Sequence, residues 1–115
     1  MTIQEMKQVY TAGLEAIIEN GADEVRKHNR SRDVNLTMER GSYWVSFSGP
    51  VNVEFGDGRY LRNVISIDIT RWHTLDLSEQ GSLYFEDTKS AARFLRQAIR
   101  DPKRAMKKMD TYFED

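Results

Sequence analysis

Residues 34–55 read VNLTMERGSYWVSFSGPVNVEF, and apolar and polar side chains alternate along this segment. The pairs Gly41-Ser42 and Gly49-Pro50 divide it into three runs. Alternation with a period of two places apolar side chains on one face of a β-strand and polar ones on the other. The runs predict antiparallel strands, because a parallel sheet covered on both faces would have unbroken apolar runs.

The alternating pattern continues beyond this segment. Gly56-Asp57-Gly58 predicts a hairpin turn, and residues 65–70 form a fourth alternating run. Residues 72–77 and 82–85 are candidates for two more strands. The sequence therefore predicts an antiparallel meander of four to six strands. We expect its apolar side chains to share one core: Val34, Leu36, Val45, Phe47, Val53, Ile65, Ile67 and Ile69.

Helical patterns precede this region. Thr2 and Glu5 form a capping-box pattern at the start of an amphipathic stretch, and Asn20-Gly21 is a typical helix stop. Leu14 and Ile17 lie on the apolar stripe of this helix and are expected to reach the core. Residues 22–28 are a candidate for a second, short helix.

Two helices are predicted after the strands. Asp87-Thr88 caps the first, which runs to Arg100 and contributes Leu95 and Ile99 to the core, and Asp101-Pro102 starts the next. The apolar phase continues across Pro102 as far as residue 113, which also fits one kinked helix. The prediction is a single α+β domain over residues 1–115. It has an N-terminal helix, the meander, and two C-terminal helices packed on the apolar face of the sheet.

Composition narrows the class of protein. A chain of 115 residues is the size of one domain, and its formal net charge is −1. The absence of cysteine excludes disulfides and thiolate metal sites, and it fits a cytoplasmic protein. No apolar run approaches the ~20 residues of a membrane helix, and no secretory signal is apparent at the start. We therefore expect no membrane association.

A basic stripe follows the last part of the chain. Residues 89–108 carry a net charge of +7, which leaves −8 for the remainder. Spacings of three and four align six basic residues on one side of a helix: Lys89, Arg93, Arg96, Arg100, Lys103 and Lys107, with Arg104 beside them. Such a stripe suits phosphate groups or an acidic protein surface. The ordinary interpretation is a solvated outer face, although such faces usually mix both signs of charge.

Trp44 is the second candidate for a contact residue. The alternation places it on the polar face of the sheet, where we expect Glu54 and Asp68 as neighbours. An exposed tryptophan on a sheet is suited to contact a partner. Two alternatives are a loop folded over Trp44 and a register displaced by one residue. Burial against a second copy would indicate a homodimer.

Catalytic and metal-binding patterns are weak. His73 lies close in sequence to Asp68 and Asp76, which allows an acid–base pair, but no nucleophile is evident beside it. His28 lies among basic residues, and the chain has no spacing typical of metal ligands. Gly56-Asp57-Gly58 lacks the residues of a phosphate or calcium loop. We expect no cofactor and no metal.

These patterns favour a cytoplasmic, non-enzymatic binding or regulatory protein. It would dock a charged face on a protein partner, as regulators, immunity proteins, chaperones and phage-encoded inhibitors do. The alternative is a nucleic-acid-associated protein that uses the basic helix. A small hydrolase or transferase that uses His73 is a remote third hypothesis. The predicted partner-binding residues are Trp44, Lys89, Arg93, Arg96, Arg100, Lys103, Arg104 and Lys107.

Overall fold

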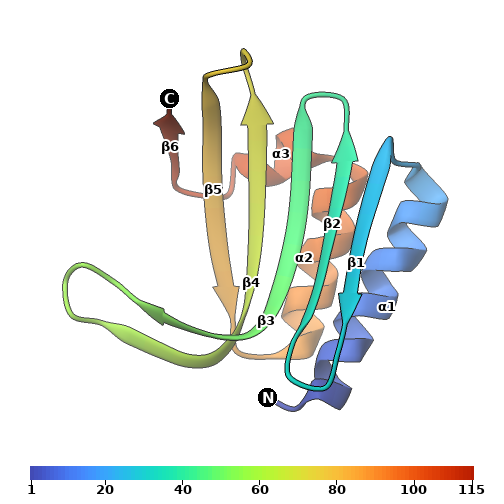
Figure 1. Cartoon of the computed structure of the whole chain (residues 1–115), viewed down its shortest axis with the longest axis vertical. Helices are drawn as coiled ribbons and strands as arrows, with labels where there is room; N and C mark the ends of the chain where they lie inside the picture. The colour runs from blue at the N-terminus through green and yellow to red at the C-terminus, as the bar shows by residue number, and fades with distance from the viewer.

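The computed structural model describes all 115 residues, and Figure 1 shows a sheet with its helices on one side. The chain begins with α1 (Ile3–Asn20) and continues through five strands into two helices and a last strand. The strands are β1 (Glu24–Asn29), β2 (Val34–Arg40), β3 (Tyr43–Glu54), β4 (Tyr60–Trp72), β5 (Ser78–Phe85) and β6 (Thr111–Glu114), and the C-terminal helices are α2 (Thr88–Arg100) and α3 (Pro102–Met106). The predicted α+β fold is confirmed.

The six strands form one antiparallel sheet in the order in which they occur along the chain. The register aligns apolar residues across the sheet, so that Leu36 faces Phe47 and Phe47 faces Ile67. The intervening polar positions align in the same way on the other face, where Ser46 lies between Thr37 and Asp68. One face is thus apolar and the other, which we call the open face, is polar.

The helices cover the apolar face. Figure 1 shows α1 and α2 side by side behind the sheet, and their apolar side chains join those of the strands in one core. α1 lies close to its neighbours at Gly13, where a β-carbon would stand 2.7 Å from Leu36 Cδ2 and 3.0 Å from Leu95 Cδ2. All of the strand residues predicted for the core are buried except Val53, which is half-buried. Leu14 and Ile17 of α1 are also half-buried. Val53 lies near the end of the β3–β4 hairpin, beyond the helices.

Caps and one arginine secure the helix ends. Thr2 forms the predicted capping box, and Asp87 and Asp101 accept backbone hydrogen bonds as N-caps of α2 and α3. The guanidinium of Arg40 donates to carbonyl oxygens at the C-terminal ends of both α1 and α2, including those of Gly21 and Ile99. A cation at a helix C-terminus satisfies carbonyls that lack helical partners and complements the helix dipole.

Two predictions at the ends of the meander are wrong. Residues 24–29 form a strand rather than a short helix, because Val25 packs against the core beside Met38 of β2. Residues 111–114 form β6 along β5 rather than extending a helix to residue 113. Phe113 is consequently 62% exposed. Sequence periodicity missed both edge strands because a neighbouring strand supplies their hydrogen bonds.

Two further differences concern the middle of the sheet. Gly49-Pro50 does not separate two strands, because β3 continues through it. The pairing of β3 with β4 shifts in register here, and such a shift accommodates Pro50, which has no N–H group to donate to the neighbouring strand. Residues 72–77 do not form a strand of their own. β4 ends at Trp72, and residues 73–77 make the connection to β5, closed by a bond from His73 N–H to the Leu77 carbonyl.

The core predicts the cost of truncating an apolar side chain. Ile67 is fully buried at the centre of the sheet, so Ile67→Ala should lower the free energy of unfolding by ~2–5 kcal/mol. Ile18 is 82% exposed, so Ile18→Ala should change it by less than about 0.5 kcal/mol. Urea denaturation of the two variants measures both values, and equal losses would contradict the assignment of this face to the core.

Candidate functional site

The basic stripe divides at Asp101. The backbone there leaves the helical conformation, with φ −145° and ψ 80°, and α3 starts in a new direction. Arg104 consequently joins Arg93, Arg96 and Arg100 around one hollow, whereas Lys103 and Lys107 line a different pocket. The prediction that Lys103 and Lys107 continue the line of the α2 arginines is therefore wrong. Only a helix continuous through Pro102 would have kept them in phase.

Four arginines form the first of these surfaces, which we call the arginine row: Arg93, Arg96, Arg100 and Arg104. They line a hollow of about 390 Å³ with Gln97, and all four are exposed. None of them, nor Lys89, lies within 4.0 Å of a carboxylate oxygen. The row is not free of negative charge, because Glu15 and Glu19 of α1 line the next hollow together with Arg96 and Arg100.

Trp44 lies on the open face, as predicted, and is half-buried. Its ring packs edge-on against Trp72, with centroids 5.4 Å apart and planes at 62°. Its cross-strand neighbours are Glu39 and Thr70, so the expected contact with Glu54, which pairs with Tyr60 in the β3–β4 hairpin, is wrong. Residues 73–75 of the connection between β4 and β5 lie beside the pair. We call the residues around it the tryptophan patch, and they line a hollow of about 500 Å³: Trp44, Trp72, His73, Thr74 and Leu75.

Charged side chains border the tryptophan patch. The guanidinium of Arg26 lies over the Trp44 ring, 5.8 Å from its centroid, and contacts Glu24 at 3.2 Å and Glu39 at 3.3 Å. Burial raises the pKa of Glu39, and its contact with Glu24 raises it further. The hydrogen bond with Glu39, followed by the contact with Arg26, lowers the pKa of Glu24. The two carboxyl groups therefore differ, and Glu39 holds its proton more tightly.

Small polar residues occupy the centre of the open face. The hydroxyls of Ser66 and Ser82 both donate to the Asp68 carboxylate, and the Ser66 bond is 3.2 Å long. No basic side chain pairs with Asp68. At the far end Tyr84 packs edge-on against Phe55 of the β3–β4 hairpin, with centroids 5.7 Å apart. The open face thus offers aromatic groups at both ends and an acid between them.

The histidines do not assemble a reaction centre. His73 Nε2 lies 3.8 Å from Glu79, and its ring packs at 5.4 Å from that of Phe113. Its carboxylate neighbour is therefore Glu79 rather than the predicted Asp68 or Asp76, because the register places Glu79 beside the end of β4. His28 bonds Asp33 at 3.1 Å. No group of three or more His, Asp or Glu side chains is placed to hold a metal ion.

Sequence reasoning missed Trp72 and Arg71. The sequence predicts a separate strand over residues 72–77, whereas Trp72 is the last residue of β4 and a diagonal neighbour of Trp44. Continuing the alternation from Ile65, Ile67 and Ile69 would have placed Trp72 on the open face and Arg71 on the other. The indole Nε1 of Trp72 is buried without a hydrogen-bond partner, which is uncommon for a tryptophan N–H.

Comparison with models of known protein families, with curated proteins and with solved structures found no match for the chain. None of the three helices has the length and apolar character needed to cross a membrane.

The Glu24–Glu39 pair predicts opposite pH effects of two matched variants. A raised pKa means that folding is favoured while Glu39 is protonated, and this advantage is lost as pH rises through its ordinary value of 4.5 and then the higher folded value. Glu39→Gln should therefore raise the thermal midpoint at pH 7 and leave it almost unchanged at pH 4.

Glu24→Gln is the control. The lowered pKa of Glu24 contributes stability that is present above its ordinary value of 4.5 and is lost as pH falls through the folded value. This variant should lower the thermal midpoint at pH 7. Calorimetry at both pH values tests the pair, and shifts of the same sign at pH 7 would contradict the asymmetry of the two carboxyl groups.

Proposed function

We propose that this is a non-enzymatic binding protein that docks the open face of its sheet on a protein partner. The observation that carries the proposal is the tryptophan patch on a face that no element of the chain covers. Leu75 in this patch is 96% exposed. Solvent-accessible apolar patches and tryptophans are typical of protein interfaces, where a few such residues supply most of the binding energy.

The charges around the tryptophan patch support a partner with basic side chains. Around the tryptophan patch, Glu24, Glu39 and Asp68 outnumber the single cation Arg26, which already contacts two of them. A partner with a basic side chain beside an apolar one would complement this arrangement, since its cation could lie near an acid while the apolar group packs on the indoles.

This role suits a regulator, an immunity protein or an inhibitor. We place it in the cytoplasm because the chain has no cysteine, which fits a reducing compartment. An enzymatic role through His73 receives less support, because a histidine and a glutamate 3.8 Å apart make a poor hydrogen bond and have no nucleophile beside them.

Trp44→Ala tests the proposed docking face. A central interface tryptophan typically contributes about 2 kcal/mol or more, so the variant should bind the partner at least ~30-fold more weakly. Affinity capture from the native host with the wild-type chain as bait would supply the partner, and calorimetry with the purified partner would give both affinities. Tyr60→Ala is the matched control, because Tyr60 is an exposed aromatic residue of the β3–β4 hairpin, away from the patch.

Fluorescence gives a second measurement on the same surface. In Trp72→Phe, Trp44 is the single tryptophan, and acrylamide should quench its fluorescence in the free protein and much less in the complex.

A partner that binds Trp44→Ala and the wild-type chain equally would contradict the proposal. A wild-type dimer that Trp44→Ala converts to a monomer, seen by light scattering, would show that the face binds a second copy instead.

The arginine row supports a second candidate function, nucleic-acid binding. Four exposed arginines without carboxylate partners are suited to phosphate groups. Glu15 and Glu19 beside the row, and the net charge of −1, make this the less favoured candidate.

Arg96→Glu with Arg100→Glu tests this second function. Neither side chain has a carboxylate partner within 4.0 Å, so the change should cost only about 1 kcal/mol of stability, from the charge at the end of α2 and from Glu15 and Glu19 in the next hollow. If the row binds a duplex through four phosphates, wild-type affinity should fall about 10²-fold between 50 and 200 mM salt, and the variant should not bind.

Arg30→Glu with Arg32→Glu makes the same change of charge in the exposed β1–β2 loop and serves as the control. A fluorescence anisotropy titration with DNA and with RNA measures all three proteins. Absence of binding by the wild-type chain at 50 mM salt would eliminate the function, as would equal binding by the α2 variant.

A further inference from the structure

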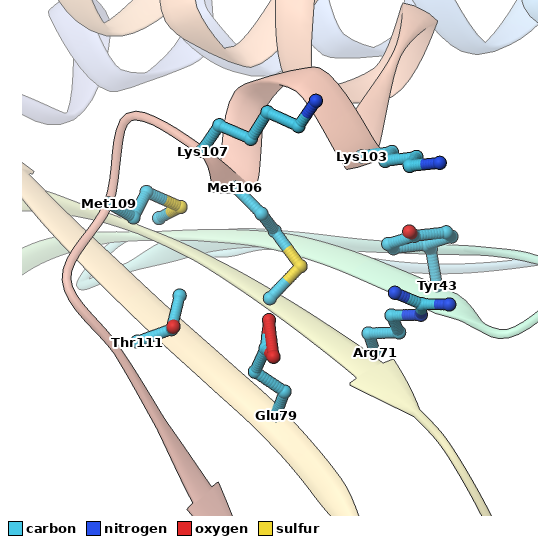
Figure 2. Close-up of a pocket in the computed structure, with 8 residues that line it drawn as sticks. All are labelled: Tyr43, Arg71, Glu79, Lys103, Met106, Lys107, Met109 and Thr111. Atoms are coloured by element: carbon cyan, nitrogen blue, oxygen red, sulfur yellow. The ribbon is translucent and has the colours of Figure 1, made fainter.

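A second pocket lies on the helix side of the sheet, away from the tryptophan patch. It has a volume of about 350 Å³, within the range of small-molecule sites, and it is lined by strand ends and by α3. Figure 2 shows Lys103 and Lys107 at α3, on one side of the pocket, with Tyr43 and Arg71 on the strands opposite, and Glu79 and Thr111 farther along the sheet. Met106 projects between these two groups.

Positive charge converges in this pocket. Arg71, Lys103 and Lys107 come from two elements that are distant in sequence, and none lies within 4.0 Å of a carboxylate oxygen. Glu79 is the one acid in the lining: it is the cross-strand neighbour of Arg71, and its Oε2 lies 3.8 Å from His73 Nε2. Three cations therefore face one acid in a chain whose acids outnumber its bases.

Arg71 is the most informative member of this group. It is half-buried, and its guanidinium lies over the Tyr43 ring at 5.7 Å from the centroid. Removing a cation from water without an anionic partner costs free energy, so such an arrangement is typical of a site that receives its anion from outside. The ring holds the guanidinium in place and leaves its N–H groups available to an anion.

The break in the helix at Asp101 determines which residues of α3 line the pocket. In a continuous helix Lys103 and Lys107 would extend the arginine row, but the new direction of α3 places them in the lining of the pocket that also contains Arg71. The same turn places Met106 and Met109, both buried, along the apolar wall. Methionine side chains are flexible and polarisable, and they adapt to aromatic and apolar groups.

We propose that this pocket binds a small phosphate monoester. Arg71, Lys103 and Lys107 hold the phosphate, for which a guanidinium fork and two ammonium groups are suited donors. The hydroxyls of Tyr43 and Thr111 are further donors in the lining. Met106 and Met109 contact the organic group, which distinguishes an ester from free phosphate. The proposal does not depend on the function of the open face.

The test is a titration of the full chain, labelled with ¹⁵N and with ¹³C at the methionine methyl groups, in a buffer without phosphate. Phenyl phosphate is the probe, and inorganic phosphate and phenol are the comparison ligands. Phenyl phosphate should give saturable shifts at Arg71, Thr111 and the methyl groups of Met106 and Met109. It should bind more tightly than inorganic phosphate, and phenol should give no saturable shift.

Lys103→Gln with Lys107→Gln is the diagnostic variant, because both side chains are exposed and unpaired, so that the fold should be unaffected. Loss of two charged donors should weaken phenyl phosphate binding by roughly 10-fold or more. Arg104→Gln removes a charge from the same helix on its other side and should change affinity by less than about twofold.

Four results would overturn the proposal. One is the absence of saturable shifts in the pocket at millimolar phenyl phosphate. Another is equal affinity of the Lys103/Lys107 variant and the wild-type chain, or shifts confined to the arginine row. Equal affinity for inorganic phosphate would refute the assignment of an ester, because the methionines would then contribute nothing.

Discussion

Burial of the one apolar face of the sheet against α1 and α2 is the constraint on which the other features of the molecule depend. Leu36, Phe47 and Ile67 align across three strands, and both long helices are needed to cover them. The chain then has no element left for the opposite face. Trp44 and Trp72 therefore remain half-exposed on the open face, with acidic side chains beside them. Core formation and the candidate docking surface are two results of the same alternation.

The position of α2 also determines where the basic residues point. The C-terminal ends of α1 and α2 both meet Arg40, whose guanidinium donates to carbonyl groups of each helix. Helices that end side by side bring two negative dipole ends together, and a shared cation offsets that repulsion. α2 is thus held at its end, and Asp101 starts α3 in a new direction. Two cationic surfaces result where a continuous helix would have had one.

These surfaces differ in the ligands that they suit. The arginine row is an exposed surface bordered by Glu15 and Glu19. The pocket at α3 is smaller and combines cations with methionines and a half-buried arginine. The open face is acidic and aromatic. The proposed protein partner and the proposed small anion would therefore bind on opposite sides of the sheet, at surfaces of opposite charge.

The sequence by itself determined the α+β class, the meander, the apolar face, the α1 cap and the placement of Trp44 on the open face. These features follow from periodicity and capping, which are local. The sequence did not determine β1 and β6, since edge strands depend on hydrogen bonds from a neighbouring strand. Nor did it reveal the Trp44–Trp72 contact or the meeting of Arg71 with Lys103 and Lys107. Only the tertiary structure decided these, because register and the direction of α3 bring together residues that no spacing along the chain relates.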